Sequence, residues 1–122
     1  MAKIDFINQL QALGYTVIEP ATGFVAFEYT IEVGKFFGQT VMLGFQVDDS
    51  FPMNPPPGPH FKPQLLPITG GGGCHPFGAI HTSALGPEWE YWSRPFTAHW
   101  NTSDKKVTTY LAHIRNLLAT VV

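Results

Sequence analysis

The first apolar positions of the chain follow a helical spacing. They recur at three-residue steps between polar side chains, at Ile4, Ile7, Leu10 and Leu13. Gly14 follows the last of them, where a left-handed cap often ends a helix. The pattern predicts a short amphipathic helix over residues 3–13.

The pattern then changes to strict alternation of apolar and polar residues, which is typical of half-buried strands. The apolar positions after Gly23 are Val25, Phe27, Tyr29, Ile31 and Val33. A turn bracketed by Gly34 and Gly38 leads to a second set at Val41, Leu43, Phe45 and Val47. We expect a strand of about ten residues from Gly23 and a second strand over residues 41–47, paired antiparallel.

Prolines dominate the next segment, with seven of them in residues 49–67. Proline has no backbone donor and biases the preceding residue toward extended structure. We therefore expect neither a helix nor a central strand here, but an extended edge with one short strand near residues 60–65.

Four glycines at residues 70–73 lead into the sequence CHPFGAIH, and an irregular loop is expected from there to Trp92. Glycine lets the backbone take positive φ or approach another chain closely. Loops of such length in a small domain are usually functional. The region is therefore the first place to look for chemistry.

Helical spacing returns near the end of the chain, after the N-cap candidates Asn101, Thr102, Ser103 and Asp104. It predicts a helix over residues 103–120. The order of elements indicates a single α+β domain over residues 1–122, in which helices pack on one side of an antiparallel meander of three to four strands.

Composition narrows the function classes. The chain has 122 residues, a net charge of −2 and only seven Lys and Arg, so the basic surface that nucleic-acid binding needs is missing. No long apolar run predicts a membrane span. The single Cys excludes an intramolecular disulfide, and the N-terminus has no signal-peptide pattern, so we expect a cytoplasmic protein.

Three short motifs lie between these predicted elements. The motifs, together with the order of the elements, resemble the ubiquitin-conjugating-enzyme (UBC-like) superfamily. FPMNPPP at residues 51–57 is similar to the family's aromatic-Pro-x-x-Pro-Pro signature, His75-Pro76 to the start of its HPN motif, and WSRP at residues 92–95 to its Trp-Ser-Pro. The segments EWEYWSR and TSDKKVTTYLAHIRNLL look most like bacterial members, similar to components of ubiquitin-like conjugation operons.

The resemblance implies a protein that handles a ubiquitin-like modifier, but two family residues are replaced. No Cys lies between Phe77 and Tyr91, where the family has its thioester-forming cysteine, and alignment puts His81 or Ser83 at that position. Phe77 stands where the HPN motif has the Asn that supports the oxyanion. The family's catalytic residues therefore do not carry over one by one.

Cys74 is the candidate nucleophile. A thiol with the ordinary pKa of about 8.5 is already partly ionised at neutral pH and can both attack and leave a thioester. Gly72 and Gly73 would let the tail of an incoming modifier lie close to the backbone, and His75 or His81 could tune the thiol. The alternative is a buried, inert Cys, which is the commonest fate of a free thiol.

The neighbouring residues each have a structural alternative. His75 either acts as an acid or base or holds the loop through backbone hydrogen bonds, and His81 is either an acid-base group or a turn residue. Trp89 and Phe77 are candidate partner contacts, whereas Trp92 is expected in the core. One Cys directly beside one His is a poor zinc spacing, so we expect no metal.

Two hypotheses follow. In the first, the protein accepts the C-terminal carbonyl of a ubiquitin-like protein on Cys74 from an ubiquitin-activating-type enzyme and passes it to an amine of an acceptor protein. No cofactor is needed, because the activating partner uses ATP. In the second, the chain is similar to inactive ubiquitin-conjugating variants and is an adaptor that binds a ubiquitin-like protein or a peptide. A metal-dependent hydrolase is a third and weaker possibility.

Overall fold

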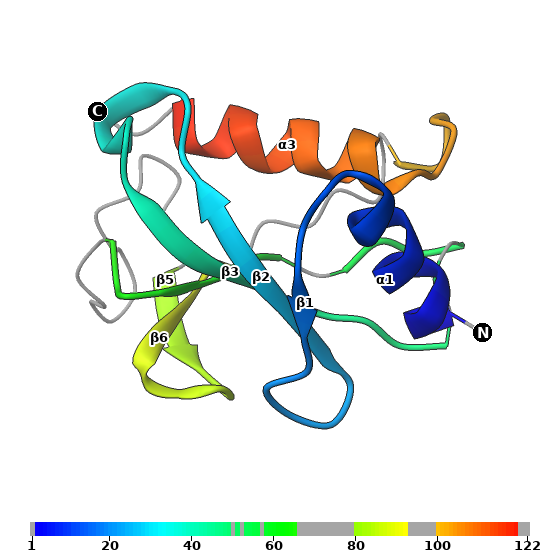
Figure 1. The fold of residues 1–122 in the computed structure, drawn as a ribbon, viewed down its shortest axis with the longest axis horizontal. Coiled ribbons are helices and arrows are strands. Elements are labelled where there is room, and N and C mark those ends of the chain that lie inside the picture. Colours follow the sequence, from blue (N-terminus) through cyan, green and yellow to red (C-terminus); the bar gives the residue numbers. More distant parts are fainter. Residues whose placement is uncertain are drawn as a thin grey trace.

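The computed structural model describes residues 2–49, 51, 53–56, 58–65, 80–92 and 100–119. Within them the chain is α+β, with two α-helices and one six-stranded antiparallel sheet (Figure 1). The helices are α1 (Ala2–Ala12) and α3 (Val107–Ala119). The strands are β1 (Val17–Ile18), β2 (Phe24–Thr30), β3 (Thr40–Gln46), β4 (His60–Lys62), β5 (Ile80–Ser83) and β6 (Gly86–Trp92), with a 3₁₀ turn η1 (Gly34–Phe36) before β3.

The strands lie in the order β1-β2-β3-β4-β6-β5. The longest pair is β2 with β3, in a register that places Val25 opposite Phe45 and Phe27 opposite Leu43. All four side chains are fully buried, so the alternation in the sequence correctly identifies the inner face. The antiparallel pairing predicted for these two segments is confirmed.

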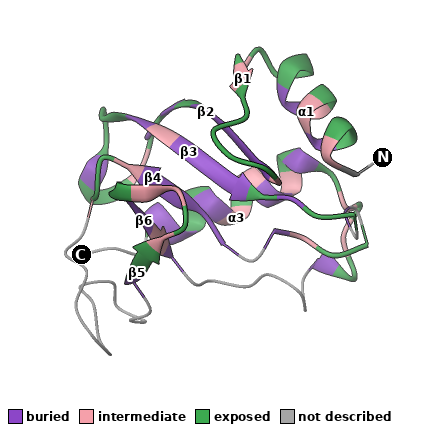
Figure 2. Ribbon diagram, turned by 90° about the horizontal axis from the view of Figure 1, so that it is seen from below, coloured by how far each residue is buried: buried purple, intermediate pink, exposed green. Residues whose placement is uncertain are grey.

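Both helices cover this inner face, as the sequence predicts. The rings of Phe6 in α1 and Tyr110 in α3 lie 5.5 and 5.1 Å from the ring of Phe45. Edge-to-face packing of this kind adds to the burial of apolar surface. Figure 2 shows the buried residues concentrated along β2, β3 and α3.

The buried face of α1 differs from the predicted one. Phe6 and Leu10 are fully buried, whereas Ile4 and Leu13 are 48% and 45% exposed. A three-residue step drifts around a helix of 3.6 residues per turn, so the ends of such a series leave the face that its middle occupies. Phe6 and Leu10 are four residues apart, so both side chains stay on the face of α1 that packs against the core.

Helix α3 begins at Val107, not at residue 103. Lys105 has a φ of 56°, which interrupts a helix, and its backbone N–H donates to Ser103 Oγ. The Val107 N–H is capped from outside the helix, because it donates to Gln9 Oε1 of α1 at 2.8 Å. The contact ties the two helices together at their ends.

The proline-rich segment contains an interior strand, which corrects the expected edge. β4 pairs with β3 on one side and with β6 on the other. Its three residues lie between Pro59 and Pro63, so each of them keeps its backbone N–H. Prolines that flank a strand do not remove its ladder hydrogen bonds.

The expected irregular loop before Trp92 contains a β-hairpin instead, made of β5 and β6. Gly86, the first residue of β6, has a φ of 126°, and the ladder has an irregularity at Thr82 and Ser83. The hairpin and the two-residue β1 explain why the sheet has six strands and not three to four. The buried, inward-facing Glu90 breaks the apolar alternation by which β6 could have been recognised.

Candidate functional site

Five of the predicted site residues lie outside the residues that the structure describes. They are Gly72, Gly73, Cys74, His75 and Phe77. The roles proposed for them stay predictions. The structure does describe His81 and Trp89, and both belong to the β5–β6 hairpin.

His81 is an exposed strand residue on the outer face of the sheet, the face away from the helices. It lies opposite Tyr91 in the pairing of β5 with β6, and the two rings are 6.2 Å apart. Its acid-base role stays a prediction. Because His81 lies in a paired strand, it is not the turn residue that the sequence analysis gave as the alternative.

Trp89 is largely buried, with 7% of its surface exposed, although it lies on the outer face. A Cβ at Gly44 of β3 would lie 3.3 Å from the indole ring, so the glycine leaves the space that the ring fills. A partner could reach only a small part of this side chain. Trp92 is fully buried on the inner face, as predicted.

A polar pair that the sequence analysis did not single out lies beside these residues. His60 of β4 is only 5% exposed, and its Nδ1 lies 2.7 Å from Ser83 Oγ of β5. The imidazole stacks on the ring of Tyr91 at 4.7 Å and meets the edge of Phe24 at 5.4 Å. Burial lowers the pKa of His60 to about 4, so the ring is neutral at pH 7.

The pair has a defined hydrogen-bond pattern. Ser83 Oγ also accepts the backbone N–H of Leu85 at 3.0 Å. With a neutral ring, one tautomer of His60 lets the Ser83 hydroxyl donate to Nδ1, which is the arrangement of a serine beside a base. In either tautomer the bond fixes the β5–β6 hairpin to the middle of the sheet.

Glu90 also connects neighbouring segments through hydrogen bonds, in this case on the inner face of the sheet. It is fully buried, and Oε1 accepts the indole N–H of Trp92 at 3.0 Å and the backbone N–H of Leu65 at 2.7 Å. Leu65 is the last described residue before the segment that carries Cys74, and Ile80, the first one after it, pairs with Trp92. Both ends of that segment are therefore held at β6.

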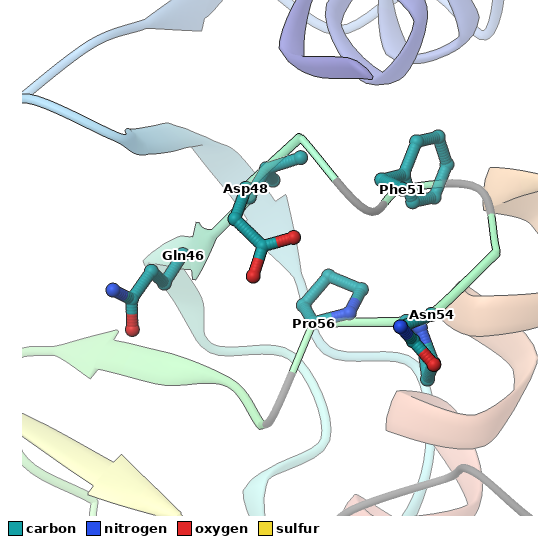
Figure 3. Close-up of a pocket in the computed structure, with 7 residues that line it drawn as sticks. Gln46, Asp48, Phe51, Asn54 and Pro56 are labelled. Carbon is teal, nitrogen blue, oxygen red and sulfur yellow. The ribbon is translucent and has the colours of Figure 1, made fainter.

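A small cavity lies where β3 leads into the proline-rich connection (Figure 3). Its volume is about 100 Å³, and its lining includes Gln46, Asp48, Phe51, Asn54 and Pro56. The ring of Phe51 points toward α1 and lies 5.1 Å from the ring of Phe6. Ligand pockets in proteins usually measure about 300–1,000 Å³, so this cavity has room only for a few water molecules or one small side chain.

Across the described ranges, no three His, Cys, Asp or Glu side chains come together as metal ligands. In the same part of the chain, no helix is both long and apolar enough to cross a bilayer. The chain matches no protein-family model, and no curated protein or solved structure is significantly similar to it.

Proposed function

We propose that the protein is a UBC-like carrier of a ubiquitin-like modifier, with Cys74 as the thioester-forming residue. The support for the proposal is the way in which the segment that contains Cys74 is anchored. Glu90 holds its start through Leu65, and the pairing of Ile80 with Trp92 holds its end. A nucleophile acts best when the protein fixes the chain on both sides of it.

The order of elements also supports the proposal. α1, the antiparallel strands, the proline-rich connection, the Cys74 segment and α3 follow one another in the order that the resemblance implies, with the β5–β6 hairpin added between the Cys74 segment and α3. The proline-rich connection is fixed to both helices, because the ring of Phe51 lies 5.1 Å from that of Phe6 in α1 and the hydroxyl of Tyr110 in α3 donates to the Pro56 carbonyl at 3.2 Å.

The chemistry would be transthiolation followed by aminolysis. The Cys74 thiolate attacks the carbonyl carbon of the modifier, which is bound as a thioester to the activating enzyme, and that enzyme's thiolate leaves. An acceptor amine then attacks the new thioester, the Cys74 thiolate leaves, and the amine loses its proton to solvent or to a nearby base. Backbone N–H groups of the glycine-rich segment are the candidate oxyanion donors, because Phe77 replaces the family's Asn.

One observation favours the second candidate, an adaptor that binds a ubiquitin-like protein without forming a thioester. The two positions that the resemblance offers for the family cysteine are occupied by His81, on a paired strand and exposed to solvent, and by Ser83 at the end of the same strand. Neither an imidazole nor a hydroxyl can form a thioester. The adaptor would still use the proline-rich connection and the hairpin as binding surfaces.

The experiment that separates the two uses ATP, a cognate activating enzyme and its ubiquitin-like protein, followed by non-reducing electrophoresis. The carrier predicts an adduct that reducing agent removes, that Cys74→Ala abolishes, and that Cys74→Ser converts into a reductant-resistant ester. His81→Ala serves as the control for loss of a nearby polar side chain. Absence of an adduct while the activating enzyme itself is charged would contradict the carrier, and modifier binding by Cys74→Ala would then support the adaptor.

A further inference from the structure

A groove larger than the cavity in Figure 3 lies between the end of β2 and α3, and we call it the β2–α3 groove. Its volume is about 260 Å³. The residues that line it are Tyr15, Tyr29, Glu32, Thr108, Leu111, Ala112 and Arg115. Those from α3 are three or four positions apart and so form one stripe of the helix. In Figure 1 the coil after α1 and the end of β2 both reach α3 in the upper part of the view.

Tyr29 brings a buried hydroxyl group to the wall of this groove. The residue lies on the inner face of β2 and is only 6% exposed. Buried tyrosine hydroxyls usually form a hydrogen bond within the protein. Among the residues that the structure describes, however, the Tyr29 hydroxyl has no hydrogen-bond partner. The groove is therefore where a partner for this hydroxyl can bind.

Two opposite charges lie beside this hydroxyl. Glu32 and Arg115 are in contact at 3.5 Å, but their side chains are 65% and 53% exposed, so the pair by itself is weak. Burial raises the pKa of Tyr15 and of Tyr29, and the negative charge of Glu32 contributes to both increases. The two phenols are therefore neutral at pH 7, and each can donate or accept a hydrogen bond close to the Glu32 carboxylate.

These groups fit a ligand that carries a positive and a negative charge a few ångströms apart. An ammonium group can donate to the Glu32 carboxylate and to the phenol oxygens. A carboxylate can accept from the Arg115 guanidinium and from the Thr108 hydroxyl. A ligand with only one charge would be repelled by one member of the Glu32–Arg115 pair. An α-amino acid meets the requirement, because it carries both groups on the same carbon atom.

The size and the remaining lining of the groove narrow the ligand further. Pockets for small molecules usually measure about 300–1,000 Å³, and this groove lies just below that range. At about 30 Å³ for each water molecule in the liquid, it has room for about nine non-hydrogen atoms. Leu111 and Ala112 add an apolar wall. A free amino acid with an aliphatic side chain, such as leucine, matches both the size and the wall.

We propose that the β2–α3 groove binds a free aliphatic α-amino acid. Its ammonium group donates to Glu32 and to the Tyr29 oxygen, and its carboxylate accepts from Arg115. Its side chain packs against Leu111 and Ala112, which removes apolar surface from water. The ligand strengthens the link between β2 and α3, because it binds to both elements.

The test follows a titration with L-leucine by two-dimensional NMR, which detects weak binding and locates it. The amide signals of Glu32 and Ala112 report from the two sides of the groove. Leucinamide, which lacks the carboxylate, and N-acetyl-leucine, which lacks the ammonium group, are matched controls. The structure predicts saturable shifts of both signals with leucine, and an affinity at least about fivefold higher than for either control. Added salt should weaken the binding.

Substitutions assign each part of the ligand to a residue. Arg115→Gln should abolish the preference for leucine over leucinamide, and Glu32→Gln should abolish the preference over N-acetyl-leucine. Tyr29→Phe should bind leucine about fivefold more weakly but should unfold in urea no earlier than wild type, because it removes a hydroxyl that no described residue contacts. Glu28→Gln removes an exposed carboxylate outside the lining of the groove and should bind like wild type.

Three results would overturn the proposal. Unchanged groove signals up to the solubility limit of leucine would leave solvent as the partner of the Tyr29 hydroxyl. Equal affinity for leucine and either control would show that the groove does not recognise both charges. Unchanged affinity in Arg115→Gln, Glu32→Gln and Tyr29→Phe would place the binding elsewhere on the protein. None of these results bears on the thioester at Cys74, so the two proposals fail separately.

Discussion

Acid should weaken the fold through His60. The folded protein holds this imidazole neutral down to about pH 4, whereas the unfolded chain takes up a proton near the ordinary pKa of 6.5. Between these two values the unfolded state binds the additional proton, so the free energy of unfolding falls as pH falls. The stability that neutral His60 contributes is fully present above the pKa of the unfolded state. It is lost as the pH falls toward the pKa of the folded state.

The size of the effect follows from the two pKa values. At about 1.36 kcal/mol per pH unit, the difference between 6.5 and about 4 gives an upper limit of about 3.4 kcal/mol. Because some solvent reaches the ring, we expect a loss of about 2–3 kcal/mol between about pH 7 and pH 4. That is a large part of the stability of a domain of this size.

Urea unfolding of wild type and His60→Asn, measured from about pH 7 to pH 4, tests this. The asparagine keeps a polar group near the position of Nδ1 for Ser83 but does not titrate. The variant should be less stable at neutral pH and should lose less stability on acidification. His81→Asn removes an exposed imidazole from the same face and should follow wild type. Parallel decline of wild type and His60→Asn would refute the reasoning, as would a His60 titration midpoint above about 6 by NMR.

Two further predictions concern packing and the anchoring of the candidate site. Gly34→Ala should lower the free energy of unfolding by more than about 2 kcal/mol, because a Cβ at this position, whose φ is 75°, meets the Leu118 carbonyl. Gly14→Ala should lower it by only about 1 kcal/mol, because Gly14 has a φ of 97° but lies in open space. Equal losses of the two variants in urea unfolding would contradict this. Glu90→Ala removes the carboxylate that accepts from the Trp92 indole N–H and the Leu65 N–H. Thermal unfolding should therefore show that the free energy of unfolding falls by about 2–4 kcal/mol. Formation of the Cys74 adduct should also fall, even at temperatures where the variant is folded. An unchanged adduct yield in folded Glu90→Ala would show that the anchor does not matter for the chemistry.

The elements with a regular period could be predicted from the sequence. The alternation around Val25 and Phe27 identified β2 and its buried face, and the helical spacing over residues 103–120 identified α3, where Tyr110 and Leu118 are buried. These signals depend on near neighbours in the chain. The start of α3 was placed too early because the positive φ of Lys105 and the cap from Gln9 are tertiary features.

The hairpin and the His60–Ser83 pair could not be predicted in this way. Glu90 faces the core because Trp92 and Leu65 donate to it, and a single charged residue at an inner position hides the strand pattern. His60 and Ser83 are 23 residues apart in the sequence, and they meet across β6, which pairs with both β4 and β5. Strand order decides that contact, and local periodicity does not encode strand order.

The central claim, a thioester on Cys74, has a direct test by intact-protein mass spectrometry. The protein is incubated with ATP, the activating enzyme and the ubiquitin-like protein, and its mass is measured without reductant. The account predicts a species heavier by one modifier less one water, reversed by hydroxylamine and absent in Cys74→Ala. A wild-type protein that keeps its original mass while the activating enzyme is fully charged, or an adduct that persists in Cys74→Ala, would contradict it.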